Sequence, residues 1–357
     1  MSFASYPFFN GGILQAALKQ AESQSRFYQV IYVPLSEIPY LFHTLTALWI
    51  IRILLTLFFV GTLYYFLLQT TKNRIMTRAV LLIFVSLFYF GGWYNSISTE
   101  PFWFGFADSL AFIGFGMLQS IDFTKCSTSQ LRKVIGMALV MAAALSYEIM
   151  MILPIVYLLL LWKKQSRVYR PNKSKSFLTL NLGLTIATLI YYLSYFIAYF
   201  MFSHKYKSHY SGTAITLGSP KEIITTDFKM SVAGFRALKY FNKLSIHTWA
   251  HYWYLDLVSL FITMLILAVF AKKTVMKTFY FNKWIIAGCI VFAFYFNIGY
   301  ALTERYRSRT KIDSMYLEAS LSSALLILGA FLLFLRISLP MCFNHLFETK
   351  FPRCSDF

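Results

Sequence analysis

Long runs of apolar residues limit what this chain can fold into more than any other feature. A helix that crosses a lipid bilayer needs about 20 mostly apolar residues, with a range of roughly 17–25. The runs that meet this requirement lie at residues 45–69, 79–93, 101–119, 134–162, 178–202, 252–271, 284–301 and 321–339. No internal repeat accompanies them. The sequence therefore predicts an all-α bundle of transmembrane helices.

The composition excludes the main alternatives to a membrane protein. Hydrophobic residues make up 58% of the 357 residues and charged residues only 13%, with a mean hydropathy of +0.58. A soluble domain carries about 25% charged residues, so a soluble protein of this size could not solvate its surface. Disorder requires low hydrophobicity. Four cysteines are too few for a disulfide-rich secreted module.

Basic residues outnumber acidic ones by 33 to 14, and their positions set the orientation. In a soluble protein this excess would suggest a nucleic-acid partner, but in a membrane protein basic residues mark the loops that stay in the cytoplasm. Basic clusters lie at residues 72–78, 132–133, 163–175 and 272–283, whereas the loop at 94–100 has none. We expect these clusters on the cytoplasmic side of the membrane, and no nucleic acid.

The run at residues 134–162 has basic residues on both flanks, which a single crossing cannot explain. Two crossings, 134–147 and 150–162, place both flanks inside. Each half has about 14 residues, or about 20 Å at 1.5 Å per residue, so we expect a short or re-entrant hairpin. Glu148 then lies at its outward tip, which avoids the cost of about 2.5–3.5 kcal/mol for a carboxylate in mid-membrane.

The resulting topology is a single transmembrane domain over residues 1–339, with about 8–9 membrane segments, and a short cytoplasmic tail at 340–357. Residues 1–44 fall outside, and no signal peptide would carry them across. A first transmembrane helix preceding this chain would explain their position; the alternative is an interfacial helix near residues 11–18. The two long outer loops are 203–251 and 302–318.

Acidic residues concentrate on the outer side of this topology. Of the 14 acids, only Asp122, Glu348 and Asp356 fall inside. Any acid–base chemistry is therefore expected on the outer face. No cysteine falls in the oxidising compartment, so no disulfide is expected.

Several charged residues are candidates for binding. Arg305 and Arg307 in the last outer loop could bind a pyrophosphate bidentately. The loop at 203–251 is net basic, which suits binding of a lipid phosphate or an acidic glycan. The alternative for both loops is contact with anionic lipid headgroups. Arg52 and Asp108 lie within predicted segments and are functional candidates by default; the alternative for them is a structural ion pair.

Cofactor motifs are scarce. His247 and His251 are four residues apart, as metal ligands on a helix would be, but they belong to no HExxH motif. A glycine-rich phosphate loop and a dinucleotide fingerprint are also missing from the sequence. We therefore expect no particular cofactor, and a divalent metal is an unsupported alternative.

Five short phrases carry a resemblance to a known family. They are Gln24-Ser-Arg-Phe-Tyr, Ser98-Thr-Glu-Pro-Phe-Trp, Ser146-Tyr-Glu, Tyr210-Ser-Gly-Thr, and the run from Glu304-Arg-Tyr to Tyr316-Leu-Glu. Their order and placement resemble the layout of the C-type (GT-C) bacterial membrane glycosyltransferases, close to the lipid-linked glucosyltransferases that modify O-antigen. The likeness covers most of the chain and rests on layout more than on any one string.

This resemblance implies a multi-pass protein of the bacterial inner (cytoplasmic) membrane. It also implies transfer of a sugar from a polyprenyl-phosphate donor to a cell-surface glycan or lipid acceptor on the outer leaflet. An outward carboxylate, Glu22, Glu37 or Glu148, would act as general base. Substrate and phosphate would be bound by Arg26, Asp108, Tyr210, Arg305, Arg307 and Tyr316. The helix that the family places before its catalytic acid is missing from this chain, so a truncated, non-catalytic membrane protein is one alternative.

Two further alternatives remain open. A glycan polymerase or ligase of the O-antigen type also has many helices and one long outer loop. A transporter of lipids or glycans usually shows repeats and helices broken by glycine or proline, and the chain has only 16 Gly and 9 Pro. Membrane lipids are expected partners under each of these hypotheses. The glycosyltransferase hypothesis adds a polyprenyl-phosphate-linked sugar and a cell-surface glycan acceptor.

Overall fold

The computed structural model describes residues 45–87, 105–121, 126–146, 148–166, 175–205, 218–232 and 283–302, together with single positions between 15 and 18 and between 307 and 333. Apart from short turns, these residues are helical, and this part of the chain contains no β-strand. The all-α prediction is confirmed to that extent.

The described elements correspond to predicted segments, except for α10, which falls in the predicted outer loop at 203–251. They are α4 (Leu45–Thr71), α5 (Arg74–Leu87), α6 (Phe106–Ser120), α7 (Cys126–Ala144), the 3-10 turn η3 (Glu148–Met151), α8 (Ile152–Ser166), α9 (Lys175–Lys205), α10 (Pro220–Val232) and α13 (Lys283–Ala301). The segment predicted at 252–271 lies outside the described residues, as does most of the one at 321–339. The full count of about 8–9 membrane segments stays a prediction.

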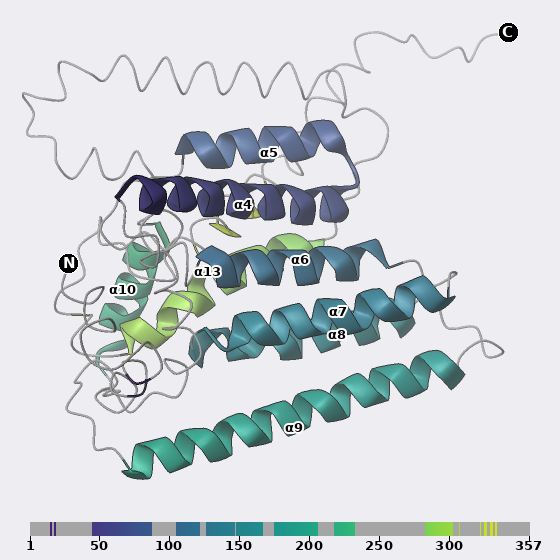
Figure 1. Ribbon diagram of the computed structural model, residues 1–357. Coiled ribbons are helices and arrows are strands. Elements are labelled where there is room, and N and C mark those ends of the chain that lie inside the picture. Colours follow the sequence, from purple (N-terminus) through teal and green to yellow (C-terminus); the bar gives the residue numbers. More distant parts are fainter. Residues whose placement is uncertain are drawn as a thin grey trace, which may run out of the picture. The chain divides into compact units, whose positions relative to one another are not determined.

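The helices fall into two compact units. Unit 1 contains α4, α6, α7, η3, α8 and α9, and unit 2 contains α5, α10 and α13. Whether these units form the single domain predicted over residues 1–339 stays a prediction. Within unit 1, α4 packs on α6, α6 on α7, α7 on α8 and α8 on α9. In Figure 1 these helices follow one another from top to bottom as α4, α6, the α7–α8 pair and α9.

Small residues allow α6 to approach its neighbours closely. A Cβ atom on Gly114 would lie 2.6 Å from the backbone oxygen of Gly136 on α7, and one on Gly116 would lie 2.5 Å from the ring of Tyr65 on α4. Glycine at such positions lets helix backbones come together where side chains would keep them apart. The Phe112 ring fills the remaining α4–α6 interface, packing 5.7 Å from the Phe59 ring and 5.5 Å from the Phe66 ring.

The predicted helical hairpin is present. The chain turns after α7 at Leu145 and Ser146, whose amides donate to Ala142 and Ala143, and η3 then leads into α8. The Tyr157 hydroxyl of α8 donates to the Lys133 carbonyl of α7 at 3.1 Å. The two helices have 19 and 15 residues, so α7 is longer than predicted because it continues into its basic flank. Residue 148 stands at the reversal, as predicted.

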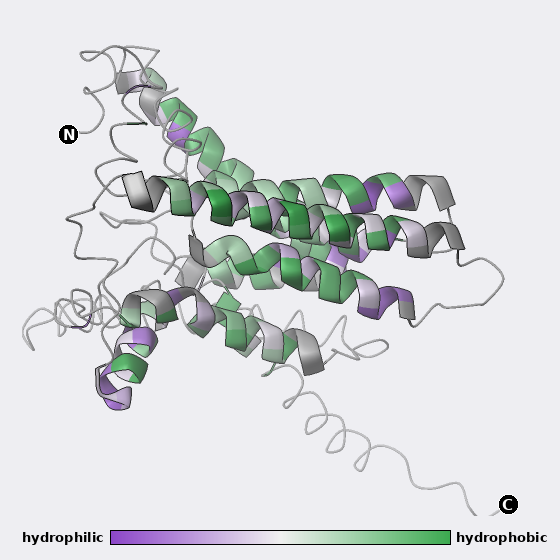
Figure 2. Cartoon of the chain, turned by 90° about the horizontal axis from the view of Figure 1, so that it is seen from below, coloured by the Kyte–Doolittle hydropathy of each residue, from purple (hydrophilic) through white to green (hydrophobic). Residues whose placement is uncertain are grey.

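Two helices in the described part are long and apolar enough to cross a membrane. Their apolar stretches are Trp49–Thr71 in α4 and Thr179–Met201 in α9, with mean hydropathies of 2.0 and 1.6. Large apolar side chains on α9 face outward, with Leu189 and Leu193 each 63% exposed. Soluble monomers rarely expose contiguous apolar surfaces of this kind. Figure 2 shows hydrophobic residues along most of the helices' length.

Candidate functional site in the α10–α13 pair

Hydrogen bonds between buried polar side chains join α10 to α13 in unit 2. The Ser231 hydroxyl of α10 donates to the Ala293 carbonyl of α13 at 3.2 Å. The Asn297 amide nitrogen donates to the Ser231 oxygen at 3.1 Å and to the Ala293 carbonyl at 3.4 Å. Ser231 and Asn297 are both fully buried. The three residues hold the two helices in register.

Asp227 lies one helical turn before Ser231, so the two side chains share a face of α10. It is only 8% exposed, and its Oδ1 atom has no hydrogen-bond partner within the described residues. Burial raises the pKa of Asp227 to about 7, although the nearby Ser231 hydroxyl opposes the rise. A carboxyl group with a pKa near the working pH is suited to act as a general base.

Asn297 provides a second buried acceptor next to the same serine. Its Oδ1 atom, like that of Asp227, has no hydrogen-bond partner among the described residues. Buried acceptors are nearly always satisfied, so two buried oxygens without a hydrogen-bond partner among the described residues, each on a neighbour of Ser231, call for an explanation. A ligand that brings hydroxyl donors between α10 and α13 would satisfy both.

Arg307 lies at one end of this helix pair. Its Nη1 atom donates to the carbonyl of Ala301, the last residue of α13, at 3.2 Å. A Cβ atom on Gly218, just before α10, would lie 2.7 Å from the guanidinium carbon. Glycine therefore makes room for the guanidinium, and the structure brings this predicted phosphate-binding residue to the same unit as Asp227.

Asp108 is buried in unit 1 but does not form the ion pair considered with Arg52. Its side chain is 1% exposed, and neither carboxylate oxygen has a hydrogen-bond partner within the described part. The Arg52 guanidinium instead lies 5.8 Å from the centre of the Trp49 ring.

The helix register explains why this pair does not form. Phe58 of α4 stacks on Phe106 of α6 at 6.2 Å, and α4 and α6 run in the same direction. Asp108 is therefore level with residue 60 of α4. Arg52 lies eight residues before that level, about 12 Å along the axis at 1.5 Å per residue. Its side chain also leans toward the start of its own helix, which takes it away from Asp108.

Lys133 departs from its predicted place in a cytoplasmic loop. It is fully buried, and its ammonium donates to Asn181 Oδ1 on α9 at 3.3 Å. The Asn181 amide in turn donates to Gln165 Oε1 on α8. Because α7 begins seven residues earlier than Lys133, this residue faces α8 and α9 and links three helices.

The remaining predicted site residues lie outside the described residues or, for residue 148, at the helix reversal. Outside the described residues lie Glu22, Arg26, Glu37, Tyr210, Arg305 and Tyr316. Residue 148 is described only as part of η3. Among the described residues, no group of three or more His, Cys, Asp or Glu side chains could hold a metal ion. His247 and His251 lie outside the described residues.

Comparisons with known proteins identify no relative. No family model matches the sequence, and no curated protein or solved structure matches it. The resemblance to C-type glycosyltransferases therefore stays a prediction.

Sequence reasoning did not single out Asp227, Ser231 or Asn297. The signal available was weak: an acid and a serine four residues apart, and one asparagine in an apolar run. The two segments are more than 60 residues apart, and only their packing brings these groups together.

Proposed function

We propose that this chain is a multi-pass protein of the bacterial inner membrane that transfers a sugar from a polyprenyl-phosphate donor to an acceptor hydroxyl on the outer leaflet. One observation carries the proposal. Asp227 and Asn297, which both neighbour Ser231, each present a buried acceptor oxygen that has no hydrogen-bond partner among the described residues. Sugar hydroxyls are the donors that such a pair would bind, and Asp227 is placed to take a proton from one of them.

The chemistry of the transfer assigns a role to each group. The acceptor oxygen forms a bond to the anomeric carbon of the donor sugar while Asp227 takes the hydroxyl proton. The bond between the anomeric carbon and the phosphate oxygen breaks, and the polyprenyl phosphate leaves with the electron pair. The Arg307 guanidinium, at the end of the same helix pair, would stabilise the charge on that phosphate. Glu22, Glu37 and Glu148 remain alternative bases.

The predicted topology supports the outer leaflet as the place of reaction. Basic clusters at residues 272–283 would hold the start of α13 in the cytoplasm, so its end at Ala301 would lie outside. Ser231 contacts Ala293, eight residues before that end. With this orientation, the contact between α10 and α13 would lie in the outer half of α13, and the outer position of the loop at 203–251 stays a prediction.

The test compares two acidic residues on one helix. Asp227→Asn removes the base, whereas Glu222→Gln removes an exposed carboxylate from the first turn of α10. Membranes containing each variant are given polyprenyl-phosphate [14C]glucose, and label transferred to cell-envelope glycan is counted. We expect Asp227→Asn to lower transfer by about 10²–10⁴-fold and Glu222→Gln to leave it unchanged. Equal transfer by wild type and Asp227→Asn would exclude Asp227 as the base.

A transporter is the second candidate, because Asp108 is a buried carboxylate without a hydrogen-bond partner among the described residues of a helix bundle. Ionisable residues in such positions commonly mark ion or proton pathways. Movement of a fluorescent lipid-linked sugar across proteoliposomes without any acceptor, abolished by Asp108→Asn and not by Asp227→Asn, would favour this candidate over the transferase.

A further inference from the structure

Cations from three helices converge on the last carbonyls of α6, at one end of unit 1. The Lys164 ammonium of α8 donates to the Leu118 and Gln119 carbonyls, both at 2.9 Å. Arg132 Nη1 of α7 donates to the Ser120 carbonyl at 3.4 Å. Lys72, directly after α4, donates to the Gln119 carbonyl at 3.4 Å. We call Lys72, Arg132 and Lys164 the basic collar.

The positive charge of the basic collar exceeds the partial negative charge at the end of α6. The last turn of α6 contains no basic residue of its own, and the end of a helix carries about half a negative charge. Asp122 is the only acidic residue between positions 109 and 147 of the sequence. Among the described residues, the three cations face only the partial negative charge of the helix end. A surplus of positive charge remains, which an anion could neutralise.

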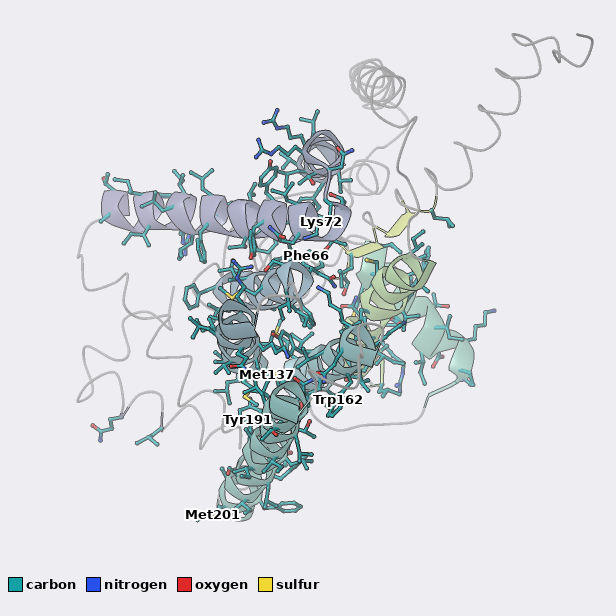
Figure 3. All side chains as sticks on the ribbon, turned by 90° about the vertical axis from the view of Figure 1, so that its right-hand side faces the viewer. Phe66, Lys72, Met137, Trp162, Tyr191 and Met201 are labelled. Carbon is teal, nitrogen blue, oxygen red and sulfur yellow. The ribbon has the colours of Figure 1, made fainter. Side chains whose placement is uncertain are left out.

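Lys72 occupies a position that usually belongs to glycine. Its φ of 54° lies in the left-handed region, and its amide donates to the Leu68 carbonyl at 2.9 Å, which ends α4. Glycine is the usual residue at such a helix end because a side chain is strained there. The turn brings the Lys72 ammonium to Gln69 Oε1, 2.8 Å away, and to the end of α6. Figure 3, seen from this end of unit 1, labels Lys72.

Exposed apolar side chains lie beside the collar on α7. Leu131 is 62% exposed, Val134 42% and Ile135 38%, while Arg132 between them is also exposed. A soluble anion would use only the cations of this surface. A phospholipid would use both parts, with its phosphate at the cations and its acyl chains along α7. The predicted topology places this end at the cytoplasmic leaflet, where anionic lipids attract basic residues.

We propose that Arg132 and Lys72 bind the phosphate of an anionic phospholipid of the inner leaflet, whose acyl chains pack on Leu131, Val134 and Ile135. The site lies in unit 1 and does not depend on the transferase proposal. It assigns these basic residues a specific ligand in addition to their expected part in setting the topology.

The test measures lipid binding by the full chain. Wild type and variants are purified in detergent, and binding of a fluorescent phosphatidylglycerol is titrated against fluorescent phosphatidylcholine. We expect wild type to prefer phosphatidylglycerol, and Arg132→Gln and Lys72→Gly each to weaken that binding about fivefold. Lys72→Gly also relieves the left-handed backbone, so its thermal stability in detergent should be kept. Lys221→Gln, an exposed cation on α10 in unit 2, should bind like wild type.

Three results would overturn the proposal. Equal binding of both lipids by wild type would show that the phosphate charge is not recognised. A loss with Lys221→Gln as large as with Arg132→Gln would show that only net charge matters. Full displacement of phosphatidylglycerol by millimolar inorganic phosphate would show that the cations bind free phosphate and that the apolar face of α7 contributes nothing.

Discussion

Asp227 shows how one buried residue links the stability of unit 2 to pH. The carboxyl has a pKa of about 7 in the folded chain, against about 3.9 in an unfolded one. The folded state therefore holds the proton more tightly, and this carboxyl favours folding most strongly below pH 4. That contribution is lost as the pH rises from about 4 to about 7.

The corresponding prediction concerns the Asp227→Asn variant. Its amide does not titrate, so the fall in stability between pH 4 and pH 7 should be smaller than in wild type. The melting temperature in detergent at pH 4, 5.5, 7 and 8 measures this difference. Glu222→Gln is the control, since that carboxylate is exposed on the same helix. Identical dependence of melting temperature on pH in wild type and Asp227→Asn would contradict a raised pKa of Asp227 in the folded chain.

At the level of helices, the α6–α7 contact depends on the small size of Gly114. A methyl group at that position would meet the Gly136 backbone oxygen and a Val140 methyl at 2.6 Å. Gly183 of α9 has nothing within 4 Å of the same added atom. The two glycines therefore form a matched pair for testing how tightly unit 1 is packed.

We expect Gly114→Ala to destabilise the protein by about 1–3 kcal/mol, because the backbones must move apart. Gly183→Ala should be neutral or stabilising by up to about 1 kcal/mol, because alanine favours the helix. Unfolding in detergent with increasing SDS measures both. If the two variants lose the same stability, the close approach at Gly114 is not what holds α6 against α7.

For the whole molecule, the decisive prediction is the topology. A cysteine at Lys163, exposed at the end of α8, should be cytoplasmic, and one at Lys221, exposed on α10, should be outside. Lys163→Cys and Lys221→Cys are introduced into a variant whose native cysteines are replaced by serine. A membrane-impermeant maleimide should label the second in intact cells and the first only after permeabilisation. The reverse labelling pattern would show that the chain has the opposite orientation. Labelling of both cysteines in intact cells would contradict the predicted topology.

The sequence by itself determined where most of the described helices are and that the chain reverses between α7 and α8, but it did not predict α10, which falls in the predicted loop at 203–251. A backbone in lipid must satisfy its own hydrogen bonds, so the length of an apolar run is close to the length of a helix. The reversal followed from basic residues at 132–133 and 163–164 on both flanks of one run, which is also local information.

Only the tertiary structure decided which polar groups meet. Ser231 and Asn297 are brought together by packing of segments distant in the chain. Lys133 becomes buried because of the face that α7 turns toward α8 and α9. Arg52 and Asp108 miss each other because of the register of α4 against α6. Contacts of this kind depend on which helix packs on which, and by how many residues it is shifted, neither of which an apolar run encodes.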